Sequence, residues 1–556
     1  MTTFVADSQE NAGGDYYTTY YAQPTFVSSR NYFCHHEGTN YAVLDFSDDN
    51  FHEFFVYKRP GKFTFRVADS LPSTVQSVSR FLGNMPELPD WIQEKAIVAV
   101  QGGTDRMKQK CEIGKKFGVP FSGVWIQDWS GQKHTPFGDR VFWNWKWDKN
   151  HYPELDQIIK DWAKDGIRLL GYINPNLDSS GDLFKEAASK GYLVKNSTGG
   201  VYLRRSITLI FGQVDLTNPD AYNWYKNVIK TNMIDLGLGG WMADFGEYLA
   251  VDAVLADGRT GMEAHNEWPV LWAKLNREAV EESGKLGEVV FYTRSGFSGT
   301  TKYSTLLWNG DQNVDFSLDD GVRSALYSSV GSGMNGNTYS HFDIGGYTTF
   351  GRFGLVRTKE LLLRSAEFAV FTSVFRTHEG NEIASNVQWY DDQVTAEFAT
   401  QAKHFALLAD YRKAVGKESV SSGLPTMRMM SLVFPTNPEP LPYDQYMFGT
   451  DLLVAPIYME SATNRQVTLP ALPGDHTWVH IWSGQTLQGL QTIQAEAPMG
   501  QPPVYYRSDS QFASTFQKLR TPVDTATNSG QNREGSTQKT AESSSTMSQA
   551  EQRNEL

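Results

Sequence analysis

From about residue 90 to residue 312, short apolar runs alternate with longer amphipathic segments. Segments 152–166 and 221–237 carry apolar residues three or four positions apart and finish with glycine, a pattern typical of helices. Strand–helix alternation of this kind predicts a parallel sheet, because parallel strands need a crossover, usually a helix. The apolar runs that predict strands here are 95–103, 122–129, 167–175, 239–246, 288–296 and 304–312.

Two later segments, 331–347 and 367–380, bring the count of expected strands to eight. Eight strands that alternate with helices favour an α/β fold of the (β/α)8 TIM-barrel type. We expect this barrel, the catalytic domain, to occupy residues 89–418. The stretch from about 176 to 225 is longer than a crossover needs, so we expect an inserted subdomain there.

The segments on either side of the predicted barrel have β character. Residues 15–70 alternate apolar and polar residues in short runs, which predicts antiparallel strands. They are too few to close two sheets, so residues 1–88 are interpreted as the remnant of an N-terminal β-sandwich domain. Residues 419–520 return to β-like runs between Pro and Gly turns and predict a C-terminal β domain. Residues 521–556 are rich in Ser, Thr, Gln and Asn and predict a disordered tail.

Composition and charge exclude several classes of function. The net charge of −13, without a basic patch, argues against nucleic-acid binding. No apolar run approaches the ~20 residues of a membrane span. The two cysteines, Cys34 and Cys111, form neither a disulfide scaffold nor a thiolate metal site. The amino terminus has no secretory-signal pattern, which favours a cytoplasmic protein, although Arg553–Leu556 weakly resembles an ER-retention tetrapeptide.

Polar residues gather where the predicted strands end, which is where barrel enzymes carry their catalytic groups. The chain contains no His or Cys cluster with metal-ligand spacing, no phosphate-binding loop and no nucleophilic Ser elbow, so no metal and no cofactor are expected. A pair of carboxylates remains, as glycoside hydrolysis requires. The polar strand ends are 127–129, 244–247, 294–295, 311–313, 341–343 and 376–378.

Several of these strand ends resemble glycoside hydrolase family 31, within its sulfoquinovosidase branch. GGWMADFGEYL (239–249) is similar to the nucleophile segment of that branch, and WNGDQNVDFSLDDG (308–321) to its acid/base segment. The likeness is collinear from about residue 10 to residue 518. It also includes VWIQDWSGQK (124–133), FWNWKWD (142–148), HFDIGGYTTF (341–350) and RTHEGN (376–381).

The resemblance implies a retaining α-glycosidase that hydrolyses α-sulfoquinovosides, such as sulfoquinovosyl glycerol, as small-molecule substrates. Asp244 then corresponds to the nucleophile and Asp311 to the acid/base. Two alternatives stay open. Asp244 can instead be a buried capping or ion-paired carboxylate, and Asp315 can exchange roles with Asp311.

Sulfoquinovose is a glucose whose carbon six carries a sulfonate, an anion with three acceptor oxygens. Arginine offers a permanently charged fork and tryptophan a single N–H donor for such a group. The resemblance assigns sulfonate binding to Arg140, Trp143 and Tyr347. Taken alone, Arg140 fits a surface ion pair equally well, and Trp143 fits a core ring.

The resemblance also assigns Gln127 and His378 to the ring hydroxyls and places Arg294 and Asp343 near the reacting ring. Glu247 orients its neighbours or has a structural role. Trp125, Trp129 and Trp145 fit either sugar platforms or the core, and the high aromatic content of 13% suits both.

Three features depart from the family pattern: the shortened N-terminal β region, the segment RRSITLIFGQ (204–213), and Phe316 where tryptophan is usual. They leave two rival functions open. One is an ordinary α-glucosidase of the same family. The other is an inactive sugar-binding protein or truncated non-enzyme. The sequence does not predict an oligomeric state.

Overall fold

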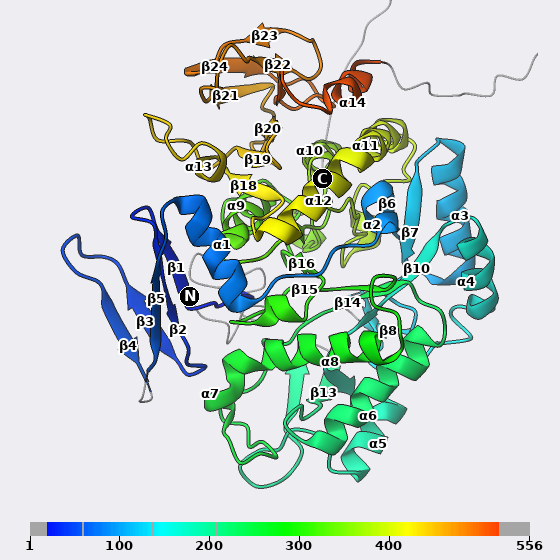
Figure 1. Ribbon diagram of the computed structural model, residues 1–556. Helices are drawn as coiled ribbons and strands as arrows, with labels where there is room; N and C mark the ends of the chain where they lie inside the picture. Colours follow the sequence, from blue (N-terminus) through cyan, green and yellow to red (C-terminus); the bar gives the residue numbers. More distant parts are fainter. Residues whose placement is uncertain (1–18, 58–60, 136–137, 207–208, 522–556) are drawn as a thin grey trace, which may run out of the picture.

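The computed structural model describes residues 19–57, 61–135, 138–206 and 209–521. The first 18 residues and most of the predicted disordered tail therefore lie outside the described residues. Within them, an α/β barrel forms the centre, with a small β sheet on one side and a β domain above it in the view of Figure 1.

A parallel sheet forms most of the barrel wall. Its strands run in the order β6-β7-β10-β14-β15-β16-β17. Single parallel bridges, Ile344 with Thr377 and Ile97 with Arg376, then close the ring through residues 374–378, here named the closing segment. The predicted TIM-barrel class is thus confirmed. The strands are β6 (Ala96–Ala99), β7 (Phe121–Trp125), β10 (Arg168–Ile173), β14 (Gly240–Ala243), β15 (Val290–Thr293), β16 (Leu306–Trp308) and β17 (Ser340–His341).

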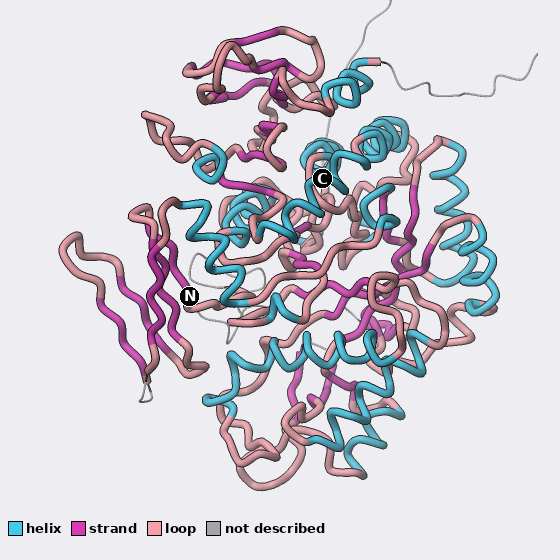
Figure 2. Tube along the Cα trace, viewed as in Figure 1, coloured by secondary structure: helices cyan, strands magenta, loops and turns pink. Residues whose placement is uncertain are grey.

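Helices cover the outside of the barrel (Figure 2), so both faces of its strands are buried. All residues of β6, β7 and β14 are buried, which explains why these strands have continuous apolar runs instead of alternation. The helices around the strands are α2 (Asp90–Glu94), α3 (Gly103–Lys116), α4 (Leu155–Lys164), α6 (Pro219–Ile229), α7 (Gly261–Ala264), α8 (Trp268–Glu282), α9 (Val322–Gly333), α10 (Lys359–Val370), α11 (Thr395–Leu407) and α12 (Ala409–Ser422).

Local sequence signals set the limits of these helices. At the start of α6, the Asn218 side chain accepts hydrogen bonds from the N–H groups of Asp220 and Ala221, and Pro219 occupies the first turn, where no intrahelical donor is needed. Helix α4 buries Leu155 and Ile158 on one face against β10. Such caps and apolar stripes determine which face of each helix meets the sheet.

Two insertions between barrel strands lie beside the carboxyl ends of those strands. A hairpin of β8 (Gln132–Thr135) and β9 (Gly138–Val141) follows β7. After β10, an antiparallel sheet forms in the order β11-β13-β12, with one helix between β11 and β12. It lies within residues 176–213, and α6 begins at Pro219. Its elements are β11 (Asn176–Asp178), α5 (Asp182–Ser189), β12 (Leu203–Ser206) and β13 (Leu209–Gln213).

The N-terminal β region is a three-stranded antiparallel sheet, β1-β2-β5, with a separate β3–β4 hairpin. Helix α1 (Leu71–Leu82) packs Val78 and Leu82 onto Phe33 of this sheet. Apolar side chains on the other strands are exposed, such as Phe65 at 58% and Val67 at 83%. Its strands are β1 (Thr25–Ser28), β2 (Tyr32–His36), β3 (Ala42–Asp45), β4 (Glu53–Val56) and β5 (Phe63–Val67).

The C-terminal β domain consists of one antiparallel sheet, β18-β19-β20-β25-β22-β23, and a second pair, β21 with β24. Trp478 and Val467 lie in its own apolar core. Its elements are β18 (Met427–Met429), α13 (Met430–Val433), β19 (Tyr446–Phe448), β20 (Leu452–Val454), β21 (Asn464–Leu469), β22 (Trp478–His480), β23 (Thr486–Leu487), β24 (Gln491–Glu496), β25 (Val504–Arg507) and α14 (Ala513–Gln517).

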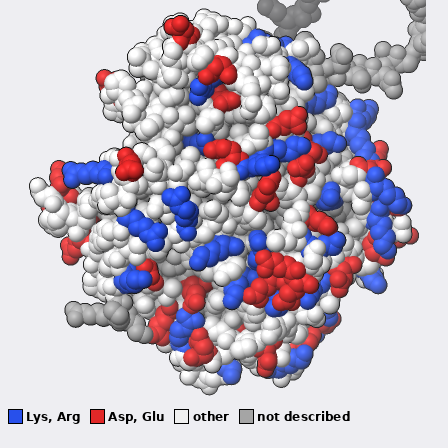
Figure 3. Space-filling model, in the orientation of Figure 1, with Lys and Arg blue, Asp and Glu red and all other residues white. Residues whose placement is uncertain are grey.

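The surface mixes both signs of charge. On the face seen in Figure 3, basic and acidic side chains are interspersed over the helices. Many of these are paired along helices, such as Arg277 with Glu281 on α8. In the described part of the chain, no helix is both long and apolar enough to cross a bilayer.

Candidate active site

Six of the predicted site residues follow the carboxyl ends of barrel strands. Because the strands are parallel, these ends meet at one mouth of the barrel. The residues are Gln127 after β7, Asp244 after β14, Arg294 after β15, Asp311 after β16, Asp343 after β17 and His378 at the end of the closing segment.

Asp244 is 5% exposed and is surrounded by hydrogen-bond donors. The hydroxyl of Tyr172 donates to its Oδ2 at 2.5 Å. The backbone N–H of Phe245 donates to its Oδ1 at 2.7 Å, and Arg294 Nε lies 3.1 Å from the same oxygen. All three partners are hydrogen-bond donors, so together they hold the Asp244 carboxyl group in one orientation.

The turn after Asp244 has an unusual backbone conformation. Phe245 has a φ of 58°, in the left-handed region that non-glycine residues rarely adopt, and its N–H donates to the carboxylate of the residue before it. Gly246 follows with a φ of 113°, and a Cβ there would lie 2.4 Å from Ser295 Oγ. Such strain is found at sites where function needs a special geometry.

Arg294 is the cation on which the acidic side chains converge. Its guanidinium is fully buried and contacts Asp244 at 3.1 Å, Glu247 at 2.6 Å and Asp311 at 3.0 Å. Burial lowers the pKa of Arg294, but these neighbouring carboxylates outweigh it and raise that pKa well above its ordinary value. Arg294 also stacks on Phe245, 4.5 Å from the ring centroid.

Glu247 is a second buried carboxyl group beside Asp244, and only 1% of it is exposed. Burial raises the pKa of Glu247 to about 7, because Arg294 offsets the cost of desolvation only in part and Asp244 adds repulsion. Its Oε2 atom has no hydrogen-bond partner among the described residues. Glu247 therefore changes charge near neutral pH.

Asp311 and Asp315, the two candidates for the acid/base, differ clearly in their surroundings. Asp311 accepts a hydrogen bond from Arg294 Nη1 at 3.0 Å, which places it beside the same guanidinium as Asp244. Asp315 instead accepts from the backbone N–H of Ser317 at 2.9 Å, within its own loop. The geometry brings Asp311 to Asp244 and leaves Asp315 as a brace of the loop.

Asp343 and Arg376 form a buried ion pair inside the barrel mouth. Burial raises the pKa of Asp343, with Arg376 acting in the opposite direction. Arg376 Nε also donates to His341 Nε2 at 2.9 Å. Asp343 Oδ2 and Arg376 Nη1 are buried and make no hydrogen bond of ordinary geometry among the described residues.

His378 is buried and has one defined tautomer. Its Nδ1 accepts a hydrogen bond from Gly380 N at 2.8 Å, so the proton of the neutral ring resides on Nε2. Burial, together with Arg376 and Arg357, lowers the pKa of His378 well below its ordinary value. The ring of Tyr347 meets His378 edge-on, with centroids 4.7 Å apart. His378 is therefore a neutral hydrogen-bond donor.

The two other proposed sulfonate ligands come from the segment after β7. Trp143 is 7% exposed and contacts the rings of Phe245 and Phe211 at 5.4 and 4.9 Å. It therefore packs directly against the residue that follows Asp244. Arg140 lies half-buried on β9, opposite Lys133 of β8.

The three tryptophans left open between core and sugar platform belong to the core. Trp125, Trp129 and Trp145 are at most 1% exposed. Their indole N–H groups donate to backbone carbonyls of Gly171, Tyr172 and Asn176. Rings buried and bonded in this way fill the space between strands and present no free face to a ligand.

Sequence reasoning missed two residues that the structure places in this network. Tyr172 lies inside β10 and bonds to Asp244, but a tyrosine within a strand carries no signal of its own. Arg376 was predicted only as a strand-end residue, and its ion pair with Asp343 appears only in the structure. Among the described residues, no group of three or more His, Cys, Asp or Glu side chains is arranged to hold a metal ion.

A closed parallel barrel with a pair of carboxylates at its mouth supplies the groups that glycoside hydrolysis uses. Two family models match the chain. Residues 99–408 match the glycosyl hydrolases family 31 TIM-barrel domain, and residues 423–510 match the glycosyl hydrolase family 31 C-terminal domain. The chain belongs to glycoside hydrolase family 31, as the resemblance of its strand ends predicted.

Relatives within the family are similar over nearly the whole chain. Sulfoquinovosidase of Escherichia coli (strain K12) is 46% identical over 93% of this chain and 76% of its own length. Sulfoquinovosidase of Agrobacterium fabrum is 43% identical over 93% of this chain and 78% of its own. A solved family 31 sulfoquinovosidase from E. rectale, in complex with the aza-sugar inhibitor IFGSQ, superposes with a TM-score of 0.88 and 41% identity, covering 93% and 77% of the two chains.

Proposed function

We propose that this chain is a retaining α-glycosidase that hydrolyses α-sulfoquinovosides to sulfoquinovose. The strongest support for the reaction is the placement of Asp244 and Asp311 on one buried guanidinium, that of Arg294, at the mouth of the barrel. Support for the substrate comes from the two relatives named sulfoquinovosidase, which share 46% and 43% identity with the chain.

In the first half of the reaction, Asp244 attacks the anomeric carbon while Asp311 gives its proton to the glycosidic oxygen of the leaving group. The bond to the aglycone breaks and an ester between the sugar and Asp244 forms. Tyr172 and the N–H of Phe245 hold the attacking carboxylate in position. Asp311 carries a proton for this step, which its ion pair with Arg294 opposes.

In the second half, Asp311 acts as a base on a water molecule, which attacks the anomeric carbon and releases Asp244. Two inversions give net retention. Arg140, Trp143 and Tyr347 bind the sulfonate of the substrate, because an arginine fork and polar aromatic donors match its three acceptor oxygens. Gln127 and the Nε2–H of His378 bind ring hydroxyls.

Hydrolysis of a chromogenic α-sulfoquinovoside and the matching α-glucoside tests this function, with wild type and Asp244→Ala compared. We expect wild type to cleave the sulfonated substrate with at least about 10²-fold higher kcat/KM, as one well-paired charge allows. Proton NMR of the first product should find the α anomer. Preference for the glucoside would contradict the substrate, and the β anomer would contradict retention.

A further inference from the structure

The barrel closes through single bridges and not through a longer strand ladder. The closing segment meets β6 by one bridge, Ile97 with Arg376, and meets the residues after β17 by another, Ile344 with Thr377. Side chains complete this seam, since the N–H of Ala99 donates to Thr377 Oγ1 at 2.8 Å. Side-chain contacts therefore add to the backbone hydrogen bonds of this seam in setting the position of the closing segment, and with it that of His378.

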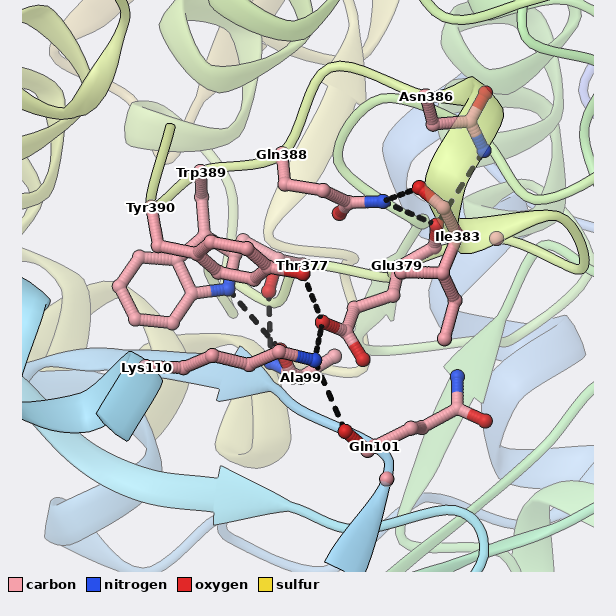
Figure 4. Close-up of polar contacts among 12 residues, drawn as sticks. Ala99, Gln101, Lys110, Thr377, Glu379, Ile383, Asn386, Gln388, Trp389 and Tyr390 are labelled. Atoms are coloured by element: carbon pink, nitrogen blue, oxygen red, sulfur yellow. Dashed lines mark hydrogen bonds and ion pairs between the residues drawn. The ribbon is translucent and has the colours of Figure 1, made fainter. Parts of the chain in front are cut away.

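A buried ion pair spans this seam (Figure 4). Lys110 of α3 pairs with Glu379, the residue after His378, and both are largely removed from water, with exposed side-chain fractions of 12% and 0%. Lys110 Nζ also donates to the carbonyl of Gln101 at 2.9 Å, just beyond β6. Lys110 thus ties the first strand of the barrel to the last, at the mouth.

The turn that carries His378 is held at three points. Tyr390 Oη donates to Glu379 Oε1 at 2.6 Å, and Gln388 Nε2 donates to the Glu379 carbonyl at 2.8 Å. Gly380 N donates to His378 Nδ1, with a φ of 85° at the glycine. A Cβ on Gly380 would lie 2.4 Å from Asn386 Nδ2, so the turn requires glycine at this position.

This ion pair is poorly suited to stabilising the fold. Burial raises the pKa of Glu379, with Lys110 opposing it, which means that the carboxylate loses more from desolvation than its partner returns. Its Oε2 atom also has no hydrogen-bond partner among the described residues. A buried pair of this kind is more useful for fixing geometry than for lowering free energy.

We propose that Lys110 and Glu379 are positioning residues of the active site, which act on the substrate through His378. Their pair sets the position of the His378 imidazole relative to the first strand, so that its Nε2–H meets a sugar hydroxyl. This inference rests on the proposed function, in which His378 binds the sugar ring.

The test compares Glu379→Gln, Lys110→Met and the double variant with a matched control, Glu367→Gln. Glu367 pairs with Arg364 and is equally buried, at 1%, but it faces the C-terminal domain, where Arg364 Nη2 donates to the Ala497 carbonyl. For each protein, kcat, KM and Tm are measured with whichever chromogenic α-glycoside the wild type cleaves. The protonation of His378 is followed by NMR with ¹⁵N-labelled histidine.

We expect Glu379→Gln and Lys110→Met to lower kcat/KM at least tenfold at a temperature well below Tm, whereas Glu367→Gln stays within twofold despite a similar loss of Tm. The double variant should regain Tm, because no lone charge is buried, but not kcat/KM. The Nε2–H signal of His378 should broaden in both single variants.

Loss of activity in proportion to Tm in every variant, or unchanged kcat/KM in Glu379→Gln, would overturn the inference. Wild type that cleaves neither glycoside would count against the proposed function instead. The histidine spectrum then decides the positioning role alone: an unchanged Nε2–H signal in both single variants would overturn it.

Discussion

The Nε atom of Arg294 lies 3.1 Å from Oδ1 of Asp244, with the guanidinium wholly buried. Because Nη1 of the same group contacts Asp311 and Nη2 contacts Glu247, one cation contacts three carboxylates of the site. It lowers the repulsion that would otherwise separate Asp244 from Asp311. Removing this cation therefore tests the geometry of these three carboxylates.

Replacing Arg294 with lysine keeps the charge but loses the planar fork that reaches three carboxylates at once. We expect kcat/KM to fall by about 10²-fold or more, because misplaced catalytic groups lose near-attack geometry. Stability should fall by up to about 3–5 kcal/mol, the cost of a buried carboxylate left without its partner, since one ammonium group cannot reach all three carboxylates. Steady-state kinetics and chemical unfolding measure both. Arg364→Lys, in another buried pair, should lose stability with little change in kcat/KM.

Tyr172→Phe removes the hydroxyl that donates to Asp244 Oδ2 at 2.5 Å without changing the ring. A hydrogen bond to a charged group contributes about 1.5–3 kcal/mol, so we predict a roughly tenfold to hundredfold decrease in kcat. Tyr411→Phe, which removes a hydroxyl bonded to the Phe448 carbonyl, is the matched control. Equal effects of both variants on kcat would contradict a role for Tyr172 at Asp244.

Asp311→Asn and Asp315→Asn separate the acid/base from its neighbour. An enzyme that lacks its acid should lose about 10²–10⁴-fold in kcat with a poor leaving group and far less with an activated one. We expect this dependence on the leaving group for Asp311→Asn only. Asp315 braces its own loop through Ser317 N, so its substitution should affect both substrates alike. The reverse pattern would exchange the two roles.

Arg140→Ala should raise KM for an α-sulfoquinovoside at least about 30-fold, as expected for a lost charged hydrogen bond, and leave any α-glucoside activity unchanged. For Arg140→Lys, KM for the α-sulfoquinovoside should lie between those of wild type and Arg140→Ala, because lysine keeps the positive charge but lacks the planar guanidinium fork. Competition assays with both substrates provide the comparison. An equal loss of activity on both substrates would mean that Arg140 supports the fold of its hairpin and does not bind the sulfonate.

Glu247 predicts a pH dependence of stability. Its pKa is raised by burial from 4.5 to about 7, so between these values the folded state keeps a proton that the unfolded state has released. Stability from this group is therefore greatest at low pH and falls as pH rises through that window. The Glu247→Gln variant lacks this carboxyl group, so nothing titrates at that position. From pH 5 to pH 8, its Tm should drop at least about 2 °C less than that of wild type. Parallel pH profiles would contradict the raised pKa.

Much of the fold was predictable because its signals are local. Apolar runs separated by amphipathic segments, such as 152–166, predicted the parallel barrel, and the structure confirms it. Strand order then placed Asp244 and Asp311 at the same mouth. The roles given to Arg140, Tyr347 and the other ligands remain predictions for the experiments above. The three core tryptophans stayed ambiguous, since sequence does not say which face of a ring is covered.

The sequence by itself determined which residue types stand at the strand ends. The hydrophobic periodicity that indicates strands and helices depends only on residues close together in the chain. Only the tertiary structure decided how they act together. Lys110 meets Glu379 across 269 positions, Tyr172 reaches Asp244 across 72, and burial moves the pKa of Glu247 toward neutrality. Hydrogen bonds and desolvation depend on distances through space and on exclusion of water, and these exist only once the barrel has closed.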